Sequence, residues 1–386
     1  SHARIVVQKY ILREMIRISG KVIQNAYDET TDVFNLLDEA ESELFKVTEG
    51  NIRKDYESMA SLLFKAQSEI EIAMQKEDGI NGVGSGFKEL DKITSGWQKS
   101  DMVVIAARPG MGKTAFVLSM ARNVAVDYKH PVAIFSLEMS SIQLVNRLIS
   151  GEAEIPAEDI RRGNFSKSEF EQFFERTKSL SEAPIFIDDT PALSIFELRA
   201  KSRRLKQQHN VQLIIIDYLQ LMSSGGKGGN REQEISNISR SIKEIAKELE
   251  IPIIALSQLS RSVETRGGDK RPMLSDLRDS GAIEQDADIV GFIYRPEYYQ
   301  LTEWPDGSPC NNQGEIIIAK HRNGSLKDVR LKFIGKYAKF SDLDGLSQND
   351  FLYNAGMKPN NDFGDDVSSF TMPSKMNDDS SNEDPF

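Results

Sequence analysis

Residues 102–114, which read MVVIAARPGMGKT, decide the fold. The first six of them are apolar without interruption, which is typical of a buried strand in a parallel sheet. Two glycines then turn the chain, and an apolar pattern with helical spacing follows over residues 116–124. A strand, a glycine loop, a lysine, a hydroxyl and a helix in this order indicate a phosphate-binding loop.

The loop has the chemistry that an anion needs. Gly110 and Gly112 let the backbone turn tightly and point N–H groups inward, and the helix start adds its positive dipole end. Lys113 can reach the β- and γ-phosphates, and the Thr114 hydroxyl can bind Mg²⁺. The usual first glycine is replaced by Ala107. The alternative is an ordinary strand–turn–helix with a solvated lysine. The predicted nucleotide-binding residues of the loop are Arg108, Gly110, Gly112, Lys113, Thr114 and Ala115.

Length and composition bound the class of protein. The chain has 386 residues, of which 39% are hydrophobic, and no run of eighteen apolar residues occurs, so we expect no membrane partner. Cys310 is the only cysteine, which excludes an internal disulfide framework and a cysteine-based metal site. A cytoplasmic protein fits these features. The net charge of −11 argues against nucleic acid, but residues 345–386 hold eight acidic residues and two lysines, so basic patches elsewhere remain possible.

The order of the patterns predicts an α/β fold. Helical patterns cover residues 3–27, 32–47 and about 55–76, and glycines from residue 79 onward mark a boundary. Strands and helices then alternate, which predicts a mainly parallel sheet with helices on both faces. A small antiparallel meander closes the sheet edge, and residues from 345 onward show no period and are expected to be disordered. The predicted strands are 102–107, 132–137, 184–188, 212–217, 252–257, 289–294, 315–320, 329–334 and 338–340; the later helices are near 140–150, 166–180, 194–208 and 231–250.

Three polar residues follow predicted parallel strands, and the carboxyl ends of such strands gather ligands at one edge. Asp217 ends the apolar run LIIID and is placed to hold Mg²⁺, although a helix cap or turn is its common alternative. Glu138 can deprotonate an attacking water, or alternatively cap the helix that begins near Ser140. Gln258 can report the presence of a γ-phosphate to a neighbouring loop.

Two further regions carry cations. Lys320, His321 and Arg322 precede an Asn-Gly turn and suit a phosphate in this subunit or in a neighbouring one; a solvated basic turn is the alternative. Residues 223–230 (SSGGKGGN) and the arginine-rich stretch 261–281 are candidate nucleic-acid loops, or else mobile surface loops. No aromatic residue lies between the cations of the second stretch, which favours contacts with the phosphate backbone over base stacking.

Together these motifs resemble the DnaB-type replicative DNA helicases. The resemblance covers nearly everything from about residue 80 to 340, and residues 1–50 resemble the end of the family's N-terminal region and its linker helix. It implies that most of the helical N-terminal domain is missing. The matching stretches are Gly84-Ser85-Gly86-Phe87 with Leu90-Asp91 and Gly96, ARPGMGKT, FSLEM, IIIDYLQL, ALSQLSR, KRPMLSDLRDSGAIEQDADIV and KHRNG.

The resemblance implies a RecA-like P-loop NTPase core in a homohexameric ring around single-stranded DNA, using ATP and Mg²⁺ and moving 5′ to 3′ to unwind forked duplex. Glu138 is then the catalytic base, and Lys320 and Arg322 act in trans on the neighbour's nucleotide, with Arg322 as the finger. Arg147 lies near the nucleotide and Gln258 senses the γ-phosphate. The DNA-contacting residues implied are Arg278, Asp279 and Gly281, and the Mg²⁺ ligands are Thr114 and Asp217.

The resemblance implies four segments. Residues 1–50 are the end of the N-terminal region with a linker helix that docks on an adjacent subunit, and residues 51–78 are a helical connector. Residues 79–344 are the ATPase domain, and residues 345–386 are a disordered acidic tail. Primase, a helicase loader and single-stranded DNA-binding protein are the expected partners, at the nucleoid. The tail ends in Asp-Pro-Phe, like the tip of bacterial single-stranded DNA-binding proteins; a solubilising tail is the alternative. Two rival functions remain: an ATP-switched ring that clamps without moving, and a recombinase that forms an open filament.

Overall fold

The structure is a computed structural model and describes residues 2–28, 58–76, 79–223 and 231–343, together with Leu36, Ala40, Glu43, Leu44 and Val47. The chain divides into two units, residues 1–343 and 344–386, and all described residues belong to the first. The predicted disordered tail therefore lies outside the described residues. So does most of the predicted helix at 32–47, although the five residues described there are helical.

A nine-stranded sheet forms the centre of the fold, in the order β3-β2-β4-β5-β1-β6-β7-β8-β9. Neighbouring strands from β3 to β6 pair in parallel, and β6 to β9 pair antiparallel. The mainly parallel sheet and the closing meander are thus confirmed. The strands are β1 (Met102–Ala107), β2 (Val132–Ser136), β3 (Ile185–Asp188), β4 (Leu213–Asp217), β5 (Ile253–Gln258), β6 (Ile289–Tyr294), β7 (Gln313–His321), β8 (Asp328–Ile334) and β9 (Lys339–Asp342).

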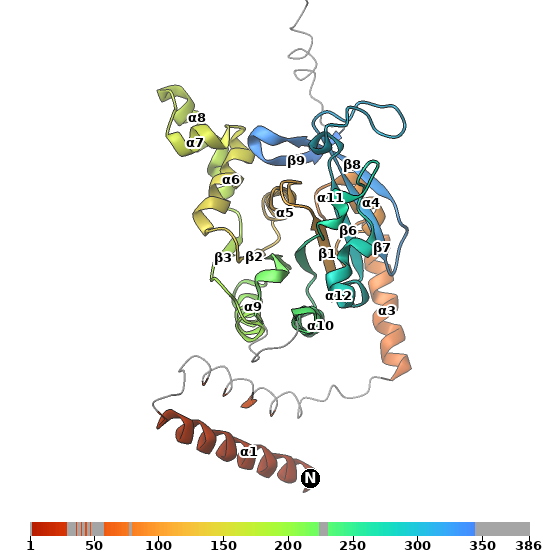
Figure 1. Cartoon of the computed structure of the whole chain (residues 1–386). Helices are drawn as coiled ribbons and strands as arrows, with labels where there is room; N and C mark the ends of the chain where they lie inside the picture. The colour runs from red at the N-terminus through yellow and green to blue at the C-terminus, as the bar shows by residue number, and fades with distance from the viewer. Residues whose placement is uncertain are drawn as a thin grey trace, which may run out of the picture. The chain divides into compact units, whose positions relative to one another are not determined.

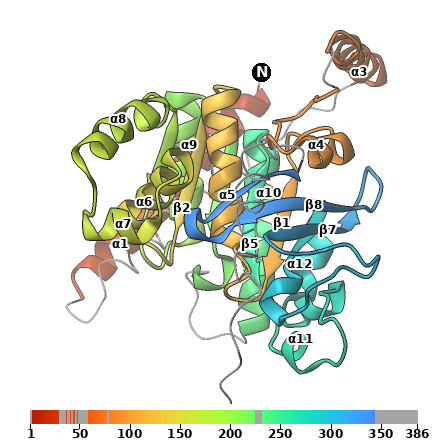
Figure 2. The ribbon, with the colours of Figure 1, turned by 90° about the horizontal axis from the view of Figure 1, so that it is seen from above.

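Helices cover both faces of this sheet because its central strands are apolar on both sides. Val103 and Ile105 of β1 pack into one core with α5 and α6, whereas Val104 packs into the other with α9 and α10. In Figure 1, α5 and α6 lie above β3, β2 and β1, and α9 and α10 lie below them. Figure 2 shows the sheet from above, running from β2 to β7 and β8 with α5 over its middle.

The described helices are α1 (His2–Ala26), α3 (Met59–Met74), α4 (Lys88–Thr94), α5 (Lys113–Arg122), α6 (Ser141–Ala153), α7 (Ala157–Arg162), α8 (Lys167–Ser181), α9 (Ile195–His209), α10 (Arg231–Leu249), α11 (Ser262–Thr265) and α12 (Gly281–Asp286). Of these, α1, α3, α5, α6, α8, α9 and α10 agree with predicted helical patterns within a few residues, whereas the short helices α4, α7, α11 and α12 were not predicted. A π-helix, Asn123–Asp127, continues α5, and short 3-10 helices occur at Leu219–Leu221, Leu274–Ser280 (η3), Pro296–Tyr299 and Gly335–Tyr337. Among the described residues, none of these helices has the length and apolar character to cross a bilayer.

Candidate functional site

The parallel register brings the predicted site residues to one edge of the sheet. Ala107 at the end of β1 pairs with Gln258 at the end of β5, and Ser136 at the end of β2 pairs with Asp217 at the end of β4. The glycine loop continues from Ala107, and Glu138 lies two residues beyond Ser136. The four segments that carry the predicted nucleotide residues therefore meet at the carboxyl edge, as open parallel sheets require of a ligand site.

The loop needs glycine at two positions. Gly112, the N-cap of α5, has φ of 96°, and a Cβ there would lie 3.2 Å from the Phe340 ring. Gly110 has φ of 79°, and its Cβ would lie 2.9 Å from the Tyr298 ring. Any other residue would be strained in this left-handed region and crowded by an aromatic ring. Since the first N–H groups of an α-helix lack internal acceptors, the start of α5 offers donors to an anion.

Lys113 and Thr114 are held in place by the strand ends. The ammonium of Lys113 donates to the carbonyl oxygen of Ala107 over 3.1 Å, and the Thr114 hydroxyl donates to Oδ2 of Asp217 over 2.8 Å. Burial lowers the pKa of Lys113, opposed by the charges of Asp217 and Glu138. Burial also raises the pKa of Asp217, while the hydrogen bond from Thr114 favours its ionised form. The hydroxyl and the carboxylate are hard oxygen ligands in contact, and they fit Mg²⁺.

Glu138 is exposed at the same edge and is free of the capping role that was its alternative. The N-cap of α6 is Ser140, which forms a capping box with Gln143. The interpretation of Glu138 as the cap of that helix is therefore wrong. The charge of Glu138 raises the pKa of Asp217 and that of Tyr218, which follows Asp217 in the chain. Glu138 thus lies within electrostatic range of the Lys113 and Asp217 pair, where an attacking water would be activated.

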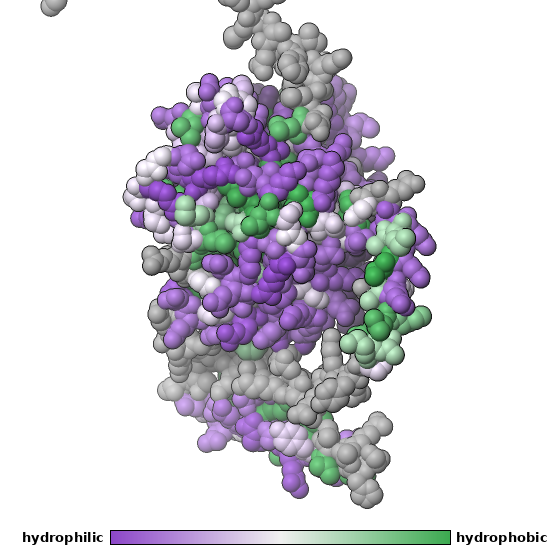
Figure 3. All heavy atoms as spheres, turned by 90° about the vertical axis from the view of Figure 1, so that its right-hand side faces the viewer, coloured by the Kyte–Doolittle hydropathy of each residue, from purple (hydrophilic) through white to green (hydrophobic). Residues whose placement is uncertain are grey.

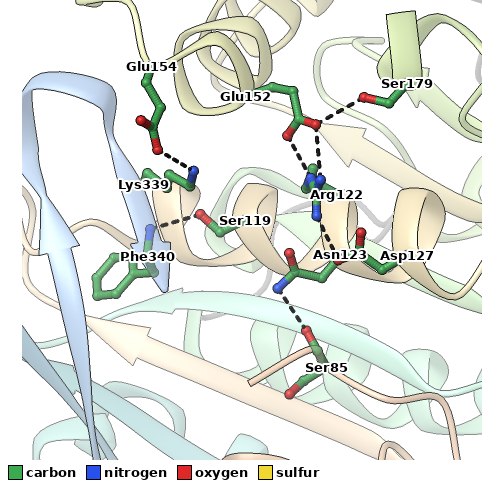
Figure 4. Close-up of polar contacts among 10 residues, drawn as sticks. All are labelled: Ser85, Ser119, Arg122, Asn123, Asp127, Glu152, Glu154, Ser179, Lys339 and Phe340. Carbon is green, nitrogen blue, oxygen red and sulfur yellow. Dashed lines mark hydrogen bonds and ion pairs between the residues drawn. The ribbon is translucent and has the colours of Figure 1, made fainter. Parts of the chain in front are cut away.

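Arg147 lies half-buried on α6, beside a cavity of about 350 Å³ between α5, α6 and β9. Its charge favours the ionised form of Asp217. Figure 4 shows how the cavity walls are joined: Arg122 of α5 binds Glu152 of α6 at 2.6 Å and 3.0 Å. In the same view the backbone N–H of Phe340 in β9 donates to the Ser119 hydroxyl over 2.9 Å. The phosphate-loop helix is thereby fixed to α6 and to the meander.

The structure identifies one residue that the sequence reasoning missed. Gln220 donates to the Ser257 hydroxyl over 2.9 Å and accepts from the backbone N–H of Gln258 over 3.4 Å. It therefore ties the segment after β4 to the end of β5. Only its position, three residues after Asp217, could have pointed to it.

The side chain of Arg108 contacts the segment that follows β5. It is buried, donates to Glu264 over 2.9 Å and donates to the carbonyl of Leu259 over 2.7 Å. These contacts engage the guanidinium with the segment after β5. The charge of Arg108 still lowers the pKa of Lys113, so the guanidinium remains within electrostatic range of the phosphate loop.

Lys320 and Arg322 lie at the opposite edge of the sheet from the phosphate loop. His321, between them, pairs with Ile289, which pairs with Val103 near the start of β1. The phosphate loop begins after Ala107, four residues or about 13 Å further along that strand. The ammonium of Lys320 donates to the Ala287 carbonyl over 2.8 Å, so Lys320 is bound rather than solvated, unlike the basic-turn alternative.

The candidate DNA-binding residues lie where η3 meets α12. Arg278 and Asp279 belong to η3, and only their backbone is described; Gly281 begins α12 and is exposed, with open space where a Cβ would stand. The other loop, 223–230, lies outside the described residues beyond Ser223.

Two of the cations in the arginine-rich stretch are engaged inside the subunit. Arg266 pairs with Asp276, and Arg271 bridges Glu315 at 2.5 Å and Asp328 at 2.6 Å. Both arginines therefore stabilise the loop, and the stretch is less available to DNA phosphates than the sequence predicted.

Comparison with known proteins gives matches over most of the chain. Residues 82–342 match the family model described as DnaB-like helicase C terminal domain. The chain is 46% identical over 344 residues to the replicative DNA helicase DnaB of Geobacillus stearothermophilus, spanning 89% of this chain and 74% of that protein. It is 45% identical to the replicative DNA helicase DnaC of Bacillus subtilis, with the same coverage.

Two solved structures share the fold. One, described as an ATPase domain, superposes with a TM-score of 0.69 at 42% identity, covering 75% of this chain and all of that one. A structure described as a DnaB-like replicative helicase and its interactions with primase superposes with a TM-score of 0.72 at 38% identity, covering 89% of this chain and 78% of that one.

Proposed function

The chain belongs to the DnaB family of replicative DNA helicases, and from that premise we propose that it hydrolyses ATP to move 5′ to 3′ along single-stranded DNA and unwind forked duplex. The carboxyl edge of the sheet supplies the parts of a nucleotide site, which are the glycine loop, the ammonium of Lys113 and the oxygen ligands of Thr114 and Asp217. Arg278, Asp279 and Gly281 are the proposed DNA contacts. Such a protein acts where replication occurs, so we place it in the cytoplasm at the nucleoid.

Each residue at the carboxyl edge has a role in this proposal. Lys113 binds the β- and γ-phosphates, and Thr114 and Asp217 hold Mg²⁺, which when bound offsets the phosphate charge. A carboxylate oxygen of Glu138 takes the proton of the attacking water. Gln258, fixed through its backbone by Gln220, contacts the γ-phosphate. The charge of Arg147 favours the ionised form of Asp217, which supports a role for Arg147 near the nucleotide.

The position of Arg322 is the observation that supports a ring. A cation at the opposite edge of the sheet cannot serve the phosphate loop of its own subunit, but it can serve that of a neighbour. Hydrolysis would then require assembly, and we propose a homohexamer. Exposed apolar side chains on α3 (Leu63, Phe64 and Ile70 among them) offer a surface that an adjacent subunit can cover. The linker role predicted for residues 32–47 remains part of this proposal.

Primase, a helicase loader and single-stranded DNA-binding protein remain the proposed partners. One structural neighbour was solved with attention to its interactions with primase, and this supports the first of them.

A forked duplex with a 5′ tail tests the function directly. Wild-type protein with ATP is expected to displace the strand, and Arg322→Ala is expected to bind ATP but to lose displacement. Mixing Arg322→Ala with Lys113→Ala subunits tests the action in trans, because some interfaces then join an intact loop to an intact finger. Partial recovery of ATP hydrolysis supports the ring; an inactive mixture refutes it. Hydrolysis by wild type without displacement would favour the clamp.

A further inference from the structure

Helix α12 connects the proposed DNA contacts to the proposed finger. Its first residue is Gly281 and its sixth and last is Asp286, a length of about 9 Å. The ammonium of Lys320 donates to the carbonyl oxygens of Glu284 and Ala287, the second over 2.8 Å. A cation on the last carbonyls of a helix caps it and meets the negative end of its dipole. Lys320 is therefore bound to the C-terminal end of α12.

Arg322 is bound to the same end of the helix. Its Nη2 donates to the carbonyl oxygen of Gln285, and its Nη1 lies 3.3 Å from Oδ1 of Asp288. Its backbone N–H donates to the Asp288 carbonyl over 2.9 Å. The side chain is still 46% exposed. The Gln285 carbonyl and Asp288 therefore hold one side of the guanidinium, and the other side is open to solvent.

Asp288 is a fixed anchor for this arginine. Its carboxylate is nearly buried; Oδ2 accepts from the backbone N–H of Met102 over 2.8 Å and pairs with the ammonium of Lys243. Lys243 also donates to the Ser100 carbonyl over 2.7 Å. The start of β1 and helix α10 therefore hold one oxygen of Asp288, and the other oxygen faces Arg322.

The body of α12 is also held as one piece. Ile283 is fully buried in the core beneath the sheet. The Ser239 hydroxyl of α10 donates to Asp286 over 2.8 Å. The backbone N–H of Ala287 donates to the Ile283 carbonyl over 3.0 Å, so the last turn of α12 is bonded to the middle of the helix and follows any shift of it. A displacement of the DNA-contacting end would therefore reach the carbonyls that bind Lys320 and Arg322.

We propose that Asp288 is a positioning residue for Arg322, and that α12 couples occupancy of the DNA contacts at and just before its first residue to the orientation of the finger at its last turn. The inference rests on the proposed function. DNA binding would thereby raise the rate at which the neighbour's ATP is hydrolysed.

The test compares Asp288→Asn with wild type in ATP hydrolysis with and without oligo-dT. Asparagine keeps an acceptor for Met102 but removes the charge that holds Arg322. We expect the stimulation by DNA to fall about tenfold, the size of one charge-assisted hydrogen bond, with KM for ATP unchanged within about twofold. The double variant Asp288→Asn/Arg322→Ala should hydrolyse no more slowly than Arg322→Ala alone, because Asp288 acts through Arg322.

Lys243→Met is the matched control, since it removes a partner of Asp288 but leaves the contact with Arg322. Its unfolding free energy should fall, while its stimulation by DNA stays within about twofold of wild type. Equal losses of DNA stimulation in Lys243→Met and Asp288→Asn would show that these residues only stabilise the fold, and this would overturn the inference. So would additive losses in the double variant.

Two outcomes separate this inference from the proposed function. If Arg322→Ala itself keeps full stimulation by DNA, the finger assignment fails. If Arg322→Ala loses stimulation and Asp288→Asn keeps it, only the positioning role fails. Should Asp288→Asn not fold, Asp288→Glu moves the charge by one methylene and is measured instead, with the same expected loss of stimulation and the same unchanged KM.

Discussion

The Thr114 hydroxyl donates a 2.8 Å hydrogen bond to Oδ2 of Asp217, which joins the first turn of α5 to the end of β4. The two proposed Mg²⁺ ligands are therefore already in contact. Asp217 is buried, which raises its pKa, and the Thr114 bond favours the carboxylate that a metal needs. The contact thus serves both the fold of the loop and its proposed chemistry.

Thr114→Val should weaken both roles. Valine has the shape of threonine but lacks the donor, so a buried carboxylate loses its partner at a cost of about 1–3 kcal/mol in unfolding free energy. Urea unfolding without nucleotide measures this loss, and ATP hydrolysis should be abolished in the same preparation. Thr114→Ser keeps the hydroxyl and is the control. A Thr114→Val protein as stable as the serine variant would contradict a structural role for the bond.

Glu138→Gln should separate binding from hydrolysis. The side chain is exposed and Ser140 caps α6, so glutamine leaves the local fold intact. Removing a general base typically slows a reaction by about 10²–10⁴-fold. Steady-state hydrolysis should fall in this range, while a fluorescent ATP analogue binds with unchanged affinity. Comparable losses in binding and hydrolysis would instead place Glu138 among the binding residues.

The sequence predicted the sheet because its strands are apolar on both faces and end in recognisable residues. Apolar runs such as 213–217 have no solvent face, so they must be central strands, and the residues after them must meet at one edge. Asp217, Glu138 and Gln258 were found in this way, and the structure brings them to the edge that carries the phosphate loop.

Side-chain partners far apart in sequence could not be predicted. The pairing of Arg271 with Glu315 and Asp328 depends on how β7 and β8 pack against the loop, and local patterns do not encode this. The same holds for Lys320, for which the turn sequence predicted a phosphate, with a solvated turn as the alternative, but which caps α12. A run of charged residues indicates that cations are present. Only tertiary packing decides which of these cations are bound to other residues of the chain.

Asp101 should make stability depend on pH. Burial, and then the charge of Asp288, raises the pKa of Asp101 to about 6. The unfolded value is about 3.9, so the folded form binds the proton more tightly, and stability falls as pH rises from about 4 to about 6. Asp101→Asn removes this penalty, which is at most about 3 kcal/mol. Urea unfolding should show the variant more stable than wild type at pH 7.5 and similar at pH 4. An equal gain at both values would exclude titration of Asp101 as the cause.

Phe64 on α3 should support assembly of the ring. Its side chain is 74% exposed, within the apolar surface of α3 that appears green at the right margin of Figure 3. Covering a phenylalanine gains about 1.5–3 kcal/mol, so Phe64→Asp should weaken each subunit contact by about tenfold or more. Mass photometry at a fixed concentration should show fewer of the proposed hexamers, and ATP hydrolysis should fall in parallel because the proposed finger acts between subunits. Phe64→Leu keeps an apolar side chain at the same position and is the matched control, so it should assemble normally. If Phe64→Asp forms as many hexamers as Phe64→Leu, another surface must hold the ring together.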